Sequence, residues 1–141
     1  MEKFESKKFD IFEKLKELNL PSGKYVVVSS GAFDALGIRP ASDIDIAVTK
    51  DLHEELRKDG TWKETELYKK IFLQKDVFTI IPELNWEKYE TTTEEAIASA
   101  MNINGFPFMN LEELLKFKKA MNREKDTKDI ELLEKMLNKK R

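Results

Sequence analysis

The pattern of apolar residues predicts strands in the first half of the chain and mainly helices in the second. Apolar residues at helical spacing predict a first amphipathic helix, built on Phe4, Ile11, Phe12, Leu15 and Leu18. Short runs of β-branched and aromatic residues predict strands over residues 25–30, 43–49, 62–65, 68–73 and 77–81. We expect the last two strands to form a hairpin that turns at residues 74–76.

Capping residues mark where further helices begin. The predicted caps are Thr49 for a helix over residues 50–58, Thr92 or Thr93 for one that runs to residue 101, Asn110 for one that runs to about residue 122 and Asp126 for the last helix. A short helix is expected over residues 31–36, and a connection over residues 102–109. Strands followed by helices, with no internal repeat, predict one α+β domain over residues 1–141, with a small mixed sheet flanked by helices.

Composition limits the possible classes of protein. The chain is 40% hydrophobic and 37% charged, as expected for a globular protein with a heavily solvated surface, and no apolar run approaches the length of a membrane span. The first residues lack the apolar stretch of a signal peptide, so we expect a cytoplasmic location and no membrane partner. The absence of cysteine excludes disulfides and thiolate metal sites, and the net charge of −2 gives no overall attraction to nucleic acid.

The most informative stretch runs from residue 25 to residue 49, where two acids lie at strand spacing. Residues two apart in a strand share a face and are about 6 to 7 Å apart, so Asp43 and Asp45 should project together while Ile44 and Ile46 face the other side. Like charges this close repel unless a proton, hydrogen bonds or a cation compensates. Mg²⁺ suits such a pair, because it takes one or two carboxylates together with substrate phosphates. A solvated edge strand is the alternative.

The same stretch resembles the signature of the polymerase-β-like nucleotidyltransferase superfamily. That signature is an apolar residue, Gly, then Gly or Ser, a spacer of about nine to thirteen residues, and an acid-apolar-acid triplet. Here Ser29-Ser30 is followed by Gly31, a spacer and then Asp43-Ile44-Asp45, with Ser29 standing where the family has Gly. The run Leu114 to Ile130, with its Lys, Arg-x-Lys-Asp and Asp-Ile pattern, is similar to the motif that ends many small members.

The resemblance implies a reaction and assigns roles to residues. Asp43 and Asp45 would hold Mg²⁺ that bridges a nucleoside triphosphate such as ATP, and a hydroxyl on a small molecule, protein or RNA end would attack the α-phosphorus and release pyrophosphate. Ser30, with the amides around Gly31, would bind the outgoing phosphates, and Ser29 would lie beside them.

Cations and a third acid complete the predicted site. Arg39, in the loop before the acids, could reach a phosphate, and Lys118 and Arg123 could bind the nucleotide or acceptor; solvated surface cations are the alternative for all three. Active members of the family carry a third metal-binding acid on a neighbouring strand, and we assign it to Asp76, with Glu83 as the substitute. A hairpin turn is the other interpretation of residues 74–76.

Two rival functions stay open at the level of sequence. One is a degenerate member of the same superfamily that binds a nucleotide or a partner protein without catalysis, which Ser29 in the glycine position favours. The other is a nucleic-acid-binding module that uses the basic stretch near Lys118, which the acidic net charge disfavours. A homodimer that completes the acceptor pocket is compatible with the chain's small size.

Overall fold

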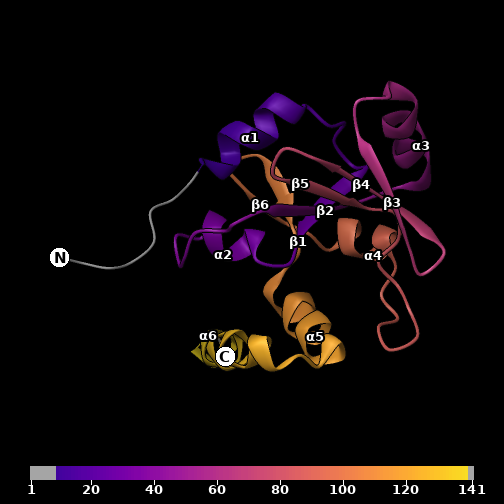
Figure 1. Cartoon of the computed structure of the whole chain (residues 1–141). Helices are drawn as coiled ribbons and strands as arrows, with labels where there is room; N and C mark the ends of the chain where they lie inside the picture. The colour runs from indigo at the N-terminus through magenta and orange to yellow at the C-terminus, as the bar shows by residue number, and fades with distance from the viewer. Residues whose placement is uncertain (1–8, 140–141) are drawn as a thin grey trace.

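A computed structural model describes residues 9–139 of the chain (Figure 1). Within these residues one mixed sheet has the strand order β3-β4-β5-β2-β1-β7-β6. The strands are β1 (Tyr25–Val28), β2 (Ile44–Val48), β3 (Lys63–Leu67), β4 (Lys70–Lys75), β5 (Phe78–Ile81), β6 (Met101–Ile103) and β7 (Phe106–Phe108). The predicted α+β class and mixed sheet are therefore confirmed.

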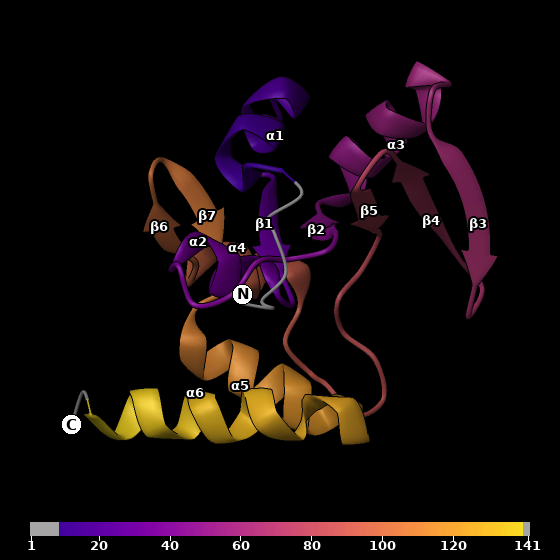
Figure 2. The same ribbon diagram turned by 60° about the vertical axis from the view of Figure 1, so that its left-hand side comes forward.

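Helices cover both faces of the sheet. They are α1 (Ile11–Leu18), α2 (Gly31–Ala35), α3 (Lys50–Asp59), α4 (Thr93–Ala98), α5 (Leu111–Met121), the 3₁₀ helix η1 (Glu124–Asp126) and α6 (Thr127–Lys139). Figures 1 and 2 show α1 and α3 on one side of the sheet and the packed pair α5 and α6 on the other. Of the residues predicted for the first helix, Phe4 lies outside the described part of the chain.

The central strands pair as the sequence indicates. Strands β1 and β2 are antiparallel, with Val28 opposite Asp45, so the turn that follows β1 lies beside the start of β2. Strand β5 adds to the other edge of β2 in parallel, with Thr79 opposite Asp45. The start of β2 is thus bordered by the end of one strand and the start of another.

Several predicted boundaries are wrong. The strand expected over residues 62–65 runs from Lys63 to Leu67, and the turn expected at residues 74–76 begins only at Asp76, because β4 continues to Lys75. The strand expected from residue 68 begins at Lys70, because Tyr68 and Lys69 form the β3–β4 turn with φ values of 53° and 63°. The expected connection over residues 102–109 contains the β6–β7 hairpin, and Asn104-Gly105 supplies its turn. Phe108 of this hairpin pairs in parallel with Val27. Residue 101 accordingly belongs to a strand and not to the preceding helix.

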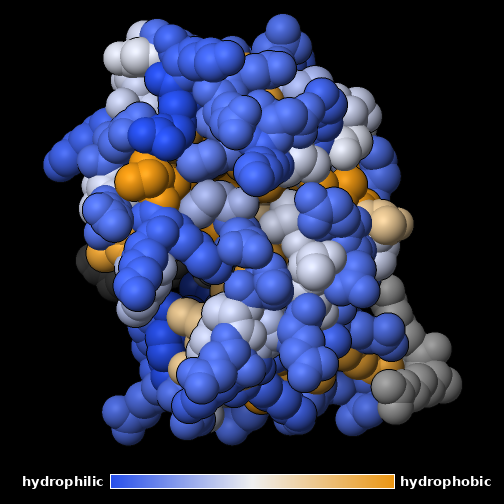
Figure 3. Space-filling model, turned by 90° about the vertical axis from the view of Figure 1, so that its right-hand side faces the viewer, coloured by the Kyte–Doolittle hydropathy of each residue, from blue (hydrophilic) through white to orange (hydrophobic). Residues whose placement is uncertain are grey.

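The surface agrees with the highly charged composition. Figure 3 shows a mainly hydrophilic face on which hydrophobic residues emerge only in small separate patches. Over residues 9–139, none of the helices combines the length and apolar character needed to cross a membrane.

Candidate functional site

The two acids of the central stretch lie at the start of β2. Ile44 is fully buried on one face of the sheet, whereas Asp45 is partly buried on the other and Asp43 is exposed just before the strand. Burial raises the pKa of Asp45 to about 6, and the negative charge of Asp43 adds to this shift. The carboxylates are therefore close enough to repel each other, as strand spacing predicts.

The turn before these acids has an unusual backbone. Ser29 adopts the left-handed conformation, with φ of 60°, which explains why a glycine suits this position. Ser30 precedes α2 without a capping hydrogen bond from its side chain, so its hydroxyl is not used as an ordinary cap. Gly31 is required by packing, because a Cβ there would lie 2.5 Å from Cγ1 of Val27.

Three cations lie near enough to Asp45 to act on its charge. Arg123, Lys118 and Lys125 all lower the pKa of Asp45, opposing the effects of burial and Asp43. Lys118 projects from α5, and Arg123 and Lys125 lie in and next to the connection to α6. The structure thus brings the sequence-predicted Lys118 and Arg123 toward the acid pair.

Lys118 is nevertheless engaged within the protein. Its side chain is 2% exposed, and its Nζ lies 3.2 Å from Oδ1 of Asp126 and 3.2 Å from Oδ2 of Asp129. Nε of Arg123 donates to Oδ2 of Asp126 at 2.6 Å. Burial would raise the pKa of Asp126, but the hydrogen bonds from Arg123 and Lys118 hold it below its ordinary value. Asp126 directly precedes Thr127, the first residue of α6, which is the position predicted for the cap of the last helix, and its buried carboxylate pairs with Lys118 and Arg123.

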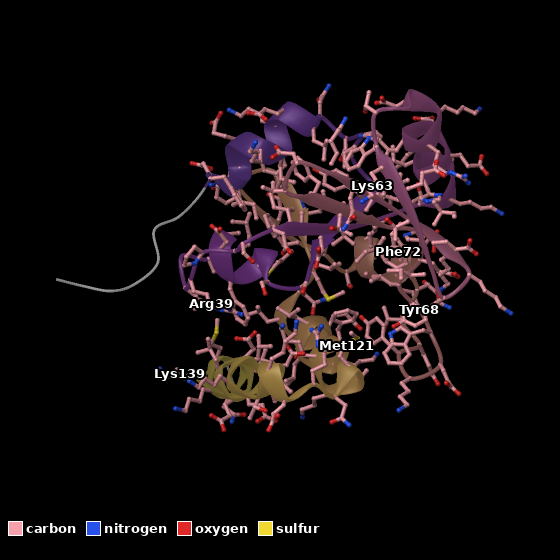
Figure 4. The ribbon with its side chains drawn as sticks, in the orientation of Figure 1. Arg39, Lys63, Tyr68, Phe72, Met121 and Lys139 are labelled. Atoms are coloured by element: carbon pink, nitrogen blue, oxygen red, sulfur yellow. The ribbon has the colours of Figure 1, made fainter. Side chains whose placement is uncertain are left out.

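Arg39 is also paired. Its Nη2 donates to Oδ2 of Asp129 at 2.6 Å, and its guanidinium lies 5.0 Å from the centre of the Phe33 ring. Figure 4 shows Arg39 between α2 and α6. The predicted role of Arg39 as a phosphate ligand has to compete with this ion pair.

Lys125 is the cation that sequence reasoning missed. It is exposed, it contributes to the electrostatic environment of Asp45, and within residues 9–139 it forms no ion pair. Its ammonium is available to a phosphate, whereas the ammonium of Lys118 and the Nε of Arg123 are each bonded to a carboxylate. Its place within the Arg-x-Lys-Asp motif is the sequence signal that could have identified it.

The structure does not bring the two candidates for a third acid to the pair. Asp76 lies 2.6 Å from Nζ of Lys14 on α1, and Glu83 lies 3.0 Å from Nζ of Lys70. The residue opposite Asp45 on β5 is Thr79, whose hydroxyl carries no charge. Over residues 9–139 no group of three or more His, Cys, Asp or Glu side chains is arranged to hold a metal ion.

The buried network also had a readable sequence signal. Leu111, Leu114, Leu115 and Lys118 follow helical spacing, so Lys118 continues the apolar stripe of α5. A lysine on the buried side of a helix requires carboxylate partners, because an unpaired buried ammonium is costly. Asp126 and Asp129 are the acids that follow, and sequence reasoning assigned neither to it.

Comparisons with known proteins add no relative. No protein-family model, no curated protein and no solved structure matches this chain.

Proposed function

We propose that this protein is a Mg²⁺-dependent nucleotidyltransferase of the polymerase-β-like type. It would move a nucleoside monophosphate from a nucleoside triphosphate to a hydroxyl on a small molecule, a protein or an RNA end. The observation that carries the proposal is the acid pair Asp43 and Asp45 at the start of β2, faced by Arg123 and Lys125 across the site. Carboxylates for a hard cation and cations for phosphates are the two requirements of this chemistry.

In this proposal, the residues on the two sides of the site have different roles. Asp43 and Asp45 would hold Mg²⁺, which when bound polarises the phosphoryl oxygens and neutralises their developing charge. The Ser30 hydroxyl makes no capping bond, and the amides of Gly31 and Ala32 at the start of α2 would donate to phosphate oxygens, whereas the amides of Phe33 and Asp34 already donate to the carbonyl of Ser30. Lys125 would attract the triphosphate from the opposite side. The backbone of Ser29 shapes the turn that lets phosphates approach.

A second candidate function is nucleotide binding without transfer. Thr79 occupies the β5 position opposite Asp45, and Asp76 pairs with Lys14. Two carboxylates are enough to bind Mg²⁺ with a triphosphate. Deprotonation of the acceptor hydroxyl would then lack a third carboxylate as base, so this arrangement favours a binding protein.

One experiment separates the two candidates. The full chain is incubated with Mg²⁺ and each labelled triphosphate in turn, and calorimetry measures binding while pyrophosphate release measures transfer. Binding with pyrophosphate release supports the enzyme, and binding without release supports the second candidate. If Asp43→Asn and Asp45→Asn both bind the triphosphate as well as the unmodified protein does, neither candidate stands. Asp76→Asn is the matched control, because it removes the same charge from the turn before the neighbouring strand β5.

A further inference from the structure

The two sides of the candidate site belong to different parts of the chain. Asp43 ends the loop between α2 and β2, whereas Arg123 and Lys125 belong to the connection from α5 to α6. Asp45 is held within β2, but Asp43 precedes that strand and the cations lie outside the sheet, so strand pairing alone does not fix the distance between Asp43 and the cationic side. A further contact has to set the width of the site.

The loop that leads to Asp43 is bonded to α2 by several backbone amides and to α6 by the side chain of Arg39. The amide of Ile38 donates to the carbonyl of Phe33 at 2.8 Å, and the amide of Ala41 donates to Oδ2 of Asp34 at 2.9 Å. Both bonds hold the loop to α2, from which it starts. Arg39 crosses from this loop to Asp129 on α6.

Asp129 is itself held in place by buried charge. Lys118 lies between Asp129 and Asp126, and Asp126 accepts a hydrogen bond from Arg123. The ion pairs therefore form a continuous series from Arg39 to Arg123. A buried ammonium is costly unless carboxylates lie within ion-pair distance of it. Lys118 therefore restricts where the carboxylates of Asp126 and Asp129 can lie.

We infer that Arg39 and Asp129 are positioning residues, whose ion pair holds the acid side of the site at a fixed distance from its cationic side. The inference rests on the proposed function, because that function identifies the site. The geometry of the ion pairs from Arg39 to Arg123 does not depend on that function. The guanidinium of Arg39 is held between the Phe33 ring and the Asp129 carboxylate. Arg39 thus acts on a bound triphosphate through the placement of Asp43 and Arg123, and not as a phosphate ligand.

The first test measures the distance directly. The chain has no cysteine, so Ser42→Cys in the loop and Lys135→Cys on α6 give two unique, exposed sites for nitroxide labels. We expect a narrow distance distribution between the labels by electron paramagnetic resonance, a broad one after Arg39→Gln, and a narrow one again after Arg39→Lys. An unchanged distribution in Arg39→Gln would overturn the inference, whether or not the protein binds nucleotide.

A matched control is available elsewhere on the surface. Arg57 is 44% exposed and paired with Glu64, close to the 45% exposure of Arg39 with Asp129. Arg57→Gln should leave the distance distribution unchanged. Equal broadening in Arg57→Gln and Arg39→Gln would show a general loosening of the fold and would also overturn the inference.

The second test asks whether Arg39 acts through Asp129. In the unlabelled chain, Arg39→Gln should weaken triphosphate binding about tenfold, a coupling of the usual size for contacting charges. In an Asp129→Asn background the same substitution should change binding by less than about twofold. A full tenfold loss in both backgrounds would show that Arg39 contacts the phosphates itself. If the unmodified protein binds no triphosphate, the proposed function fails, and the label distances still decide the inference.

Discussion

Strands β2 and β5 are parallel neighbours, and an aspartate precedes each of them. The carboxylates of these two aspartates, Asp43 and Asp76, lie in different surroundings. Asp43 and Asp45 at β2 face the cations of α5 and the α5–α6 connection, whereas Asp76 before β5 faces α1 and pairs with Lys14. The register puts Ile44 opposite Phe78, so Asp76 is one residue out of phase with Asp43. Asp76 lies in the turn before β5, with φ of 56°, and its carboxylate is directed to Lys14 on α1.

The difference shows that a carboxylate near the same end of the sheet does not by itself belong to the candidate site. Asp76 lies near the same end of the sheet as the acid pair, yet its carboxylate is used in a surface ion pair. Thr79 has the correct phase and lacks the charge. Substitutions at these positions test this contrast between the two strands.

The largest effect is expected from the acids of β2. Asp43→Asn and Asp45→Asn should each lower the rate of pyrophosphate release about a thousandfold, because a bound metal ion supplies several kcal/mol of transition-state stabilisation. Asp76→Asn should change it less than about twofold, since its charge faces α1. Release is measured with Mg²⁺ and the best triphosphate. An equally severe loss in Asp76→Asn would contradict the assignment of faces.

The pKa of Asp45 makes the stability of the protein depend on pH. Its rise from 3.8 to about 6 means that between these values the folded protein holds a proton that the unfolded chain has released. Stability should therefore fall as pH rises through this window, by about 3 kcal/mol in all, and the full loss should be present above pH 6.

Urea denaturation of Asp45→Asn tests this dependence. Asp45→Asn should not lose stability as pH rises through this window, and at pH 7.5 without metal it should be more stable than the unmodified protein. Asp76→Asn should show the same dependence of stability on pH as the unmodified protein. The same slope in Asp45→Asn and in the unmodified protein would show that Asp45 is not the group responsible.

Thr79→Asp should give β5 the acid that it lacks. Neighbouring strands lie about 4.8 Å apart, so the new carboxylate would project beside Asp45. We expect Mg²⁺ affinity to rise about tenfold and metal-free stability to fall by about 1 kcal/mol through repulsion. Thr79→Asn is the uncharged control. If only Thr79→Asp releases pyrophosphate, this result would favour the binding-only candidate for the natural chain. If the Mg²⁺ affinity is unchanged, residue 79 lies outside the site.

The smallest effect is expected at the turn beside β2. Ser29→Gly should stabilise the fold by up to about 1 kcal/mol, because it relieves the left-handed backbone while costing some chain entropy. Triphosphate binding should be unchanged or a few-fold tighter. Gly31→Ala is the opposite case, since its Cβ would clash with Val27 and should destabilise the protein. Weaker triphosphate binding in Ser29→Gly would identify the Ser29 hydroxyl as a ligand.

Local rules in the sequence determined much of the central region. The alternation of Asp43, Ile44 and Asp45 depends only on the two-residue period of a strand, and the side chain of Asn110 caps α5 as its spacing from Glu113 predicts. Helix α3 ends at Gly60, whose left-handed backbone, with φ of 77°, is one that glycine adopts readily. Each of these features is settled by residues within a few positions of one another.

Tertiary structure alone decided which distant residues complete the site. The pairing of Asp76 with Lys14 follows from where α1 packs, and the partners of Arg39 and Lys118 follow from how α6 packs beside α5. The β6–β7 hairpin needed the docking of Phe108 beside Val27. These contacts join residues far apart in the chain, and their energies depend on burial and charge pairing that exist only once the helices lie against the sheet.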